Sequence, residues 1–214
     1  MASENPEESF VPRRRVPTQE RSRKRVADLL DGAAELVEEK GVEALSTRAI
    51  AERAGVPVAS LYQYFADKED VLLALLDRAM VETSQRVEAA VAALPRHGIA
   101  DMVAATTRAY AEVFRERRAL VQIWLRGRTN PAVSEYGRAH NQRIAQQVVD
   151  AAVTLGMAPD TLSPKVLLLA VELGDRALQL AFADSDEGDQ ELIDESIVLI
   201  TAYLEKRAPA VPGA

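Results

Sequence analysis

The chain has 214 residues, 48% of them hydrophobic, no cysteine and a formal net charge of −7. This composition excludes disulfide and thiolate chemistry, and the acidic sum argues against a protein that coats nucleic acid without selectivity. The apolar run at 166–171 is far shorter than the roughly 20 residues that span a membrane, and the acidic start MASENPEESF lacks the apolar stretch of a secretory signal. We expect a cytoplasmic protein of one or two domains without a membrane segment.

Basic residues gather near the N-terminus, against the acidic balance of the whole chain. Between Val11 and Ala27, seven basic residues face one acid, Glu20, which gives this segment a local charge of +6. The prolines within residues 1–18 predict a flexible basic arm, which suits the minor groove or the backbone of DNA. A solvated tail is the alternative. Where the first helix begins, Arg23 is expected to contact a phosphate.

The first helix is predicted over residues 19–40. Its apolar residues recur at helical spacing and would form one buried stripe. Gly41 follows directly and supplies a helix stop. The stripe consists of Val26, Leu29, Leu30, Ala33 and Val37.

Residues 45–68, LSTRAIAERAGVPVASLYQYFADK, form the most informative segment. Ser46 is a good N-cap for a short helix over 47–54. Gly55 stands where a helix end needs a left-handed residue, and a second short helix is predicted over 58–65. Two short helices joined by a glycine turn are typical of a helix-turn-helix DNA reader.

Two tyrosines and one lysine of this segment are candidate DNA contacts. Tyr62 and Tyr64 diverge by roughly 200° on a helix, so at least one phenol should lie at the surface and donate to a phosphate oxygen. Asp67 is the expected N-cap of the next helix, with Asp70 as the acid of a capping box. Lys68 places a cation where the helix dipole favours anions, and a docked phosphate would explain it. The alternative is a solvated lysine paired with a carboxylate.

The motifs LSTRAIA, AGV, SLYQYF and DKEDVL, in this order and spacing, resemble the DNA-binding domain of the TetR (tetracycline-repressor-like) family of bacterial transcription regulators. The resemblance covers about a quarter of the chain and implies a helix-turn-helix domain over 19–67. It also implies DNA contacts, mostly to the backbone, from Thr47, Arg48, Ser60, Tyr62, Tyr64 and Lys68.

The sequence departs from the family pattern where the recognition helix begins, at Pro57-Val58-Ala59, and at Gln63, where histidine or tryptophan is common. Val58 and Ala59 can touch thymine methyl groups, and Gln63 can contact adenine if it faces the groove. The expected DNA-binding residues are Arg23, Ser46, Thr47, Arg48, Val58, Ala59, Ser60, Tyr62, Gln63, Tyr64 and Lys68.

The rest of the chain shows helical periodicity and no strand signal, which predicts an all-α fold of about nine helices. The remaining helices are expected over 68–94, 99–116, 118–127, 131–155, 164–183 and 191–206. Residues 68–207 would form a helical ligand-binding and dimerisation domain, and 208–214 a flexible tail.

The last two long helices, about 164–183 and 191–206, are apolar on two sides. In the final one, Ile193 and Ile197 belong to one stripe, while Leu192 and Leu199 add a second. One side can serve the subunit core and the other needs a partner. The TetR resemblance implies a second copy, hence a homodimer on a palindromic operator in double-stranded DNA. A helix pair buried in a monomer is the alternative.

The layout of the family also implies a pocket for a small-molecule effector in the second domain. An apolar pocket with a few polar groups suits an aromatic or amphipathic ligand. Each of these aromatic residues could instead belong to the core. The candidate lining residues are Met102, Tyr110, Phe114, Trp124, Tyr136, His140 and Phe182.

The function that follows is sequence-specific transcriptional regulation, as a repressor that an apolar or amphipathic ligand releases from its operator. The alternatives are a regulator that answers to a protein partner, and an all-helical ligand-binding protein or enzyme on the same fold. With no cysteine, two histidines, no glycine-rich phosphate loop and no dinucleotide fingerprint, we expect no enzyme activity, no cofactor and no metal site.

Overall fold

The computed structural model describes residues 20–95, 98–126, 130–154, 159 and 161–207. Regular structure in these segments consists of nine α-helices and one 3-10 helix, η1, which confirms the predicted all-α fold. The elements are α1 Glu20–Lys40, η1 Val42–Ala44, α2 Thr47–Arg53, α3 Val58–Leu61, α4 Lys68–Ala92, α5 Ile99–Glu116, α6 Arg118–Arg126, α7 Pro131–Thr154, α8 Pro164–Ala181 and α9 Gln190–Arg207.

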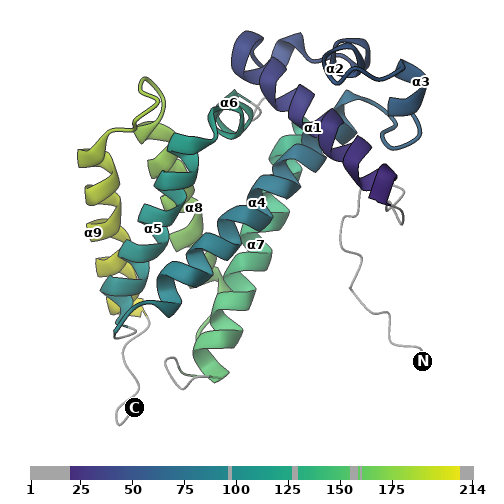
Figure 1. Cartoon of the computed structure of the whole chain (residues 1–214). Helices are drawn as coiled ribbons and strands as arrows, with labels where there is room; N and C mark the ends of the chain where they lie inside the picture. The colour runs from purple at the N-terminus through teal and green to yellow at the C-terminus, as the bar shows by residue number, and fades with distance from the viewer. Residues whose placement is uncertain (1–19, 96–97, 127–129, 155–158, 160, 208–214) are drawn as a thin grey trace, which may run out of the picture.

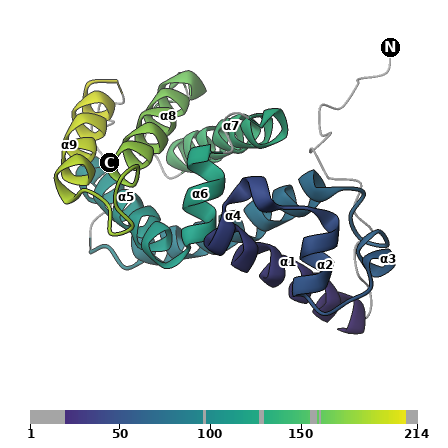
Figure 2. The same ribbon diagram turned by 90° about the horizontal axis from the view of Figure 1, so that it is seen from above.

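The helices form a small head and a larger body. The head consists of α1 to α3, and the long helix α4 runs from it along the body (Figure 1). Viewed from above, α7, α8 and α9 lie side by side in one layer, with α4 and α5 in a second (Figure 2). Helix α6 lies between the head and the body and contacts α1, α4, α5 and α8. It therefore occupies the junction through which the body can influence the head.

Helix α3 is shorter than the sequence predicts. It ends at Leu61, and the chain winds on through turns to Phe65. The backbone N–H of Gln63 donates to the carbonyl of Ser60 at 3.3 Å, and that of Tyr64 to the carbonyl of Leu61 at 2.9 Å. These tighter bonds replace the regular helical pattern while Phe65 still reaches the core, where it is only 2% exposed. At the other helices, the observed ends lie within two residues of the predicted ones.

The core of the head is built on the apolar stripe of α1, all five predicted members of which are buried. Leu61 and Phe65 pack in the same cluster, together with Ile50 of α2. Gly32 allows α1 and α2 to approach closely, because a Cβ there would lie 3.2 Å from the backbone nitrogen of Ala54. Burial of these side chains holds the two short helices of the head against α1.

The body contains two separate hydrophobic clusters. The first is continuous with the head and includes Phe114, Trp124 and Phe182. The second lies at the far end of the bundle and includes Val149 and Leu204. In the described segments, no helix has the length and apolar character needed to cross a bilayer.

Candidate DNA-binding surface and effector site

Side-chain caps fix the starts of α2 and α4. The Ser46 hydroxyl accepts the backbone N–H of Ala49 at 3.1 Å. Asp67 accepts the N–H of Asp70 at 2.9 Å, and the Asp70 carboxylate accepts the N–H of Ala66 at 2.8 Å. Each cap satisfies a donor that the helix leaves free and so holds its helix in register. The capping roles expected for Ser46 and Asp67 are both present.

The two tyrosines after α3 point in different directions. Tyr62 is 56% exposed, and its hydroxyl lies 3.1 Å from the Thr47 hydroxyl at the start of α2. Tyr64 is half-buried, and its hydroxyl lies 3.0 Å from that of Ser22 near the start of α1. Tyr62 is therefore the better placed of the two to donate to a phosphate, while Tyr64 ties α1 to the turn after α3.

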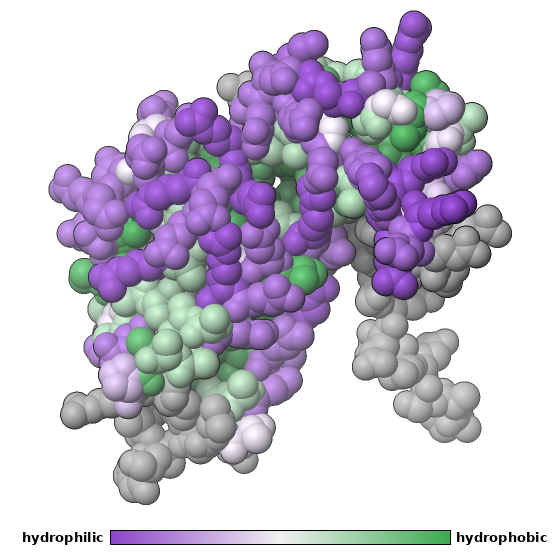
Figure 3. Space-filling view, viewed as in Figure 1, coloured by the Kyte–Doolittle hydropathy of each residue, from purple (hydrophilic) through white to green (hydrophobic). Residues whose placement is uncertain are grey.

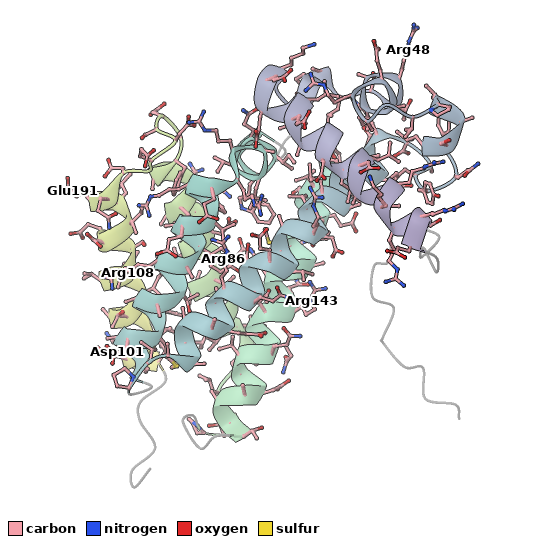
Figure 4. The ribbon with its side chains drawn as sticks, in the orientation of Figure 1. Arg48, Arg86, Asp101, Arg108, Arg143 and Glu191 are labelled. Atoms are coloured by element: carbon pink, nitrogen blue, oxygen red, sulfur yellow. The ribbon has the colours of Figure 1, made fainter. Side chains whose placement is uncertain are left out.

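The other candidate DNA contacts lie at the surface of the head. Arg48 extends from the head into solvent (Figure 4). Lys68 is half-buried and forms no ion pair with any residue that the structure describes, which does not support the paired-lysine alternative. Arg23, Ser46, Ala59 and Gln63 are exposed, and Thr47, Val58 and Ser60 are half-buried. The arm at 1–18 lies outside the described residues.

An ion-pair cluster clamps α2 to α1. The Arg53 guanidinium donates to both carboxylate oxygens of Glu39, at 2.8 and 2.6 Å, and to Glu35 at 3.1 Å. Hydrogen bonding to Arg53 lowers the pKa of the Glu39 carboxyl. Because the two hydrogen bonds from Arg53 to Glu39 are parallel, they fix the orientation of α2 on α1 as well as holding the two helices together.

Further ion pairs join the head to the body. Arg78 of α4 lies 2.7 Å from Asp31 of α1. The carboxylate of Glu38, also on α1, accepts the backbone N–H of Ala119 at 3.3 Å, near the N-terminus of α6. Within the body, Arg86 bridges α4 to the end of α5 through Glu116 at 2.6 Å (Figure 4). Helices α4 and α6 are thus in direct contact with α1.

Between the two hydrophobic clusters of the body lies a set of polar residues that we call the polar layer. Along α5, α7, α8 and α9 these residues fall between members of the first cluster and members of the second. Four are buried, and Tyr110, Glu172 and Asp175 are half-buried. The polar layer consists of Thr107, Tyr110, His140, Asn141, Glu172, Asp175 and Ser196.

Several groups of the polar layer are already hydrogen-bonded. The indole N–H of Trp124 donates to the carboxylate of Asp175, and the Asn141 amide donates to Glu172 at 3.0 Å. Burial, with the nearby charge of Asp175, raises the pKa of the Tyr110 phenol. Loss of either hydrogen bond would take a donor from a partly buried carboxylate, which costs free energy. These contacts therefore fix the relative positions of α6, α7 and α8.

The structure brings some of the predicted pocket residues together. Two of them, Tyr110 and His140, belong to the polar layer, and Trp124 and Tyr136 contact its members. The rings of Tyr136 and His140 stack with centroids 6.1 Å apart. Phe114 and Phe182 instead pack edge to face at 5.4 Å within the first hydrophobic cluster. Met102 is half-buried two turns before Tyr110 on α5. The predicted set thus divides into a group around polar atoms and a pair that serves the core.

Two comparisons with protein families cover most of the chain. Residues 29–75 match the bacterial regulatory proteins of the tetR family, and residues 97–208 match the tetracyclin repressor-like C-terminal domain. The second match alone spans more than half of the sequence. The chain belongs to the TetR family.

Individual relatives agree with this membership. The transcriptional regulator EthR of Mycobacterium tuberculosis is 27% identical over 199 residues, which cover 91% of this chain and 90% of EthR. A TetR-family regulator from Streptomyces coelicolor has a crystal structure with a TM-score of 0.66 and 31% identity, covering 86% of this chain and 99% of that one. The multidrug-binding protein EbrR, crystallised with imidazole, shares the fold at 20% identity and a TM-score of 0.62, over 88% of this chain and 97% of EbrR. This TetR-family chain is a DNA-binding transcriptional regulator.

The sequence interpretation missed most of the polar layer. Glu172 and Asp175 are acids within the mostly apolar stretch LLLAVELGDRALQLA, and this contrast was the available signal. Gly137 was also missed. A Cβ there would lie 3.4 Å from Cη2 of Trp124, so the glycine brings α7 close to the indole ring. Its role depends on a contact between α6 and α7 that periodicity does not reveal.

Proposed function

We propose that this TetR-family regulator is a homodimeric repressor that binds a palindromic operator and is released by a small apolar or amphipathic effector. The observation that carries the proposal is the head surface, where Tyr62 and Arg48 are exposed and Lys68, half-buried, forms no ion pair with any described residue. Such groups bind phosphates and set the protein's register on DNA. We assign the DNA-binding domain to 19–67 and the dimerisation and effector domain to 68–207, with a basic arm at 1–18 and a tail at 208–214.

The exposed faces of α8 and α9 support dimerisation. Leu169 and Leu180 on α8 are each 47% exposed, and Val198 and Leu199 on α9 are 63% and 56% exposed. Hydrophobic residues also gather on the lower part of the body in the view of Figure 3. Exposed apolar side chains on neighbouring helices favour a partner, and a second copy would bury both helices of each subunit. Two heads related by a two-fold axis then require a palindromic site.

The effector would act by changing the populations of two arrangements of the dimer. A ligand in the polar layer touches helices that contact α4 and α6, which in turn contact α1 of the head. If the ligand binds more tightly to the arrangement whose heads do not fit the operator, it releases the DNA. Effector and operator must then weaken each other by the same factor.

This proposal assigns the chain to regulation in the cytoplasm and gives it no catalytic role. Its relatives are named as transcriptional regulators. Among the described residues, no group of three or more histidine, cysteine, aspartate or glutamate side chains is arranged to hold a metal ion. A regulator that answers to a protein partner remains the second candidate, and exposed Leu192 and Val81 are surfaces on which such a partner could dock.

Selection of bound sequences from random duplex DNA tests the proposal directly. The purified wild type is run beside a Tyr62→Phe/Lys68→Ala double variant, with Lys40→Ala as a control because Lys40 is exposed at the end of α1 opposite to Arg23. We expect a palindromic motif from the wild type and the control, and none from the double variant. A half-site motif without symmetry would contradict the dimer, and no enrichment would contradict operator binding in the absence of effector.

Effector release is tested separately on the recovered operator. Compounds that change the fluorescence of Trp124, the sole tryptophan, are added to the protein–DNA complex. The proposal expects a ligand that weakens operator binding and is itself bound more weakly when operator is present. Simultaneous binding with unchanged affinities would contradict the release mechanism but not the DNA-binding function.

A further inference from the structure

The His140 ring has one nitrogen paired and the other unpaired. Only 5% of the residue is exposed. Its Nδ1 lies 3.0 Å from Nη2 of Arg143. Its Nε2 is buried and has no hydrogen-bond partner among the residues that the structure describes, an arrangement that buried polar atoms rarely show.

The contact with Arg143 decides which nitrogen carries the proton. A guanidinium has donors only, so Nδ1 must accept. In a neutral imidazole the proton then resides on Nε2, which becomes a donor. Burial, together with the charge of Arg143, lowers the pKa of His140 to about 4, so the ring is neutral near pH 7. The interior of the body therefore contains an N–H donor that has no acceptor within the described segments.

The Nε2–H donor of His140 lies among aromatic and polar side chains of the body. Gly137, one turn earlier on α7, borders Trp124, and the adjacent Asn141 binds Glu172. The acids near this ring already accept hydrogen bonds, Glu172 from Asn141, Asp175 from Trp124 and Asp77 from Tyr136. His140 thus belongs to the polar layer, next to aromatic rings and between two apolar clusters.

We propose that Nε2–H of His140 is the hydrogen-bond donor that selects the effector, and that the effector is a neutral aromatic compound with a carbonyl-type acceptor. This inference rests on the effector site of the proposed function. The aromatic part packs against Trp124 and Tyr136, and the carbonyl oxygen accepts from Nε2. A carboxylate is disfavoured, because Glu172 and Asp175 place two negative charges in the same layer, whereas Arg143, the cation at Nδ1 of His140, is exposed to solvent.

Three small probes of similar shape separate the effect of the carbonyl acceptor on binding from the effects of the apolar body and of negative charge. Benzylacetone carries the neutral carbonyl, butylbenzene replaces that carbonyl with a methylene, and hydrocinnamate replaces the terminal methyl with a negative oxygen. Each is titrated calorimetrically into the full-length wild type, His140→Phe and His140→Gln. The phenylalanine variant keeps a ring without a donor, and the glutamine variant keeps an amide N–H as a rescue. Thermal unfolding of each variant verifies that it is folded.

We expect benzylacetone to bind the wild type more tightly than hydrocinnamate. In His140→Phe its affinity should fall roughly three- to tenfold relative to that of butylbenzene, the range of one hydrogen bond, and His140→Gln should recover most of the loss. In ¹⁵N-histidine spectra, the Nε2–H signal of His140 should shift with benzylacetone and not with butylbenzene. The chain has only two histidines, so His140→Gln assigns the signal.

The outcomes that overturn the inference are distinct from those that overturn the proposed function. If benzylacetone and butylbenzene lose affinity equally in His140→Phe, or if benzylacetone leaves the Nε2–H signal unchanged, His140 does not select the ligand, and the effector site still stands. If none of the three probes binds the wild type at millimolar concentration, the polar layer is not a site for neutral aromatic ligands. That result removes this inference together with its assignment of the effector site, and leaves DNA binding untouched.

Discussion

The hydroxyl groups of Thr47 and Tyr62 lie 3.1 Å apart and join the first turn of α2 to the turn after α3. Because Tyr62 is 56% exposed, this contact holds a long side chain that would otherwise sample several rotamers at the surface. The TetR resemblance implies a DNA contact from each of these residues. We propose that their mutual contact orients the Tyr62 phenol toward a phosphate before DNA arrives, which would reduce the ordering cost of binding.

Removing the Tyr62 hydroxyl should weaken binding to all DNA sequences alike. We expect Tyr62→Phe to cost about 1 kcal/mol per head, because one phosphate hydrogen bond is lost and no base contact changes. Thr47→Val should show a smaller loss with Tyr62 retained. Fluorescence anisotropy with operator and with scrambled duplex provides the measurement. A loss confined to the operator would instead indicate that Tyr62 reads bases.

Lys68 should contribute through its charge. Lys68→Ala is expected to weaken DNA binding and to reduce the slope of log affinity against log salt concentration by about one per subunit, because one phosphate contact disappears. Binding is measured at four salt concentrations, beside Lys40→Ala at the far end of α1 as the matched control. An unchanged slope in Lys68→Ala would show that the lysine does not touch a phosphate.

Two glycines of the body should respond to alanine in opposite directions. Gly188 has φ of 74°, and a Cβ there would lie 2.7 Å from Cζ of Phe182, so Gly188→Ala should destabilise by about 2 to 4 kcal/mol. Gly137 is helical, and its Cβ would meet Trp124 at an ordinary 3.4 Å. Gly137→Ala should stabilise by about 0.5 to 1 kcal/mol through helix propensity. Urea unfolding measures both, and effects of the same sign would contradict this account.

The helices of the body could be predicted closely because the sequence marks their ends. Pro131 and Pro164 begin α7 and α8, and Gly98 precedes α5. The end of α3 could not be predicted. Leu61 and Phe65 share a face in a regular helix, and they share the same cluster after the chain tightens into turns, so the apolar pattern is satisfied either way.

The polar layer could not be predicted from hydrophobic periodicity, for a different reason. Whether His140 has a partner depends on Arg143 one turn later, on Asn141 turning to α8, and on the absence of an acceptor near Nε2 within the described residues. Only packing of four helices decides such facts. Aromatic residues such as Phe114 and Tyr110 look alike in the sequence, and they separate into core and layer only when α5 meets its neighbours.

The stability of the folded protein should depend on pH through His140. Its pKa is lowered to about 4, against about 6.5 for an exposed histidine, because burial and Arg143 disfavour the charged ring more than Asp77 favours it. Above pH 6.5 both folded and unfolded forms are neutral and no penalty exists. As the pH falls toward 4 the unfolded chain binds the proton first, so stability is lost, by about 2 kcal/mol at pH 5.

His140→Gln cannot titrate and is the matched control for this prediction. Urea unfolding at pH 7.5 and pH 5 should show a larger fall in the free energy of unfolding for the wild type than for the variant, by about 2 kcal/mol. Equal falls in the two proteins would mean that the His140 ring is protonated as readily in the folded state as in the unfolded chain. The ring would then not be held neutral by its surroundings, and its Nε2–H would lose the single tautomer that makes it a selective donor.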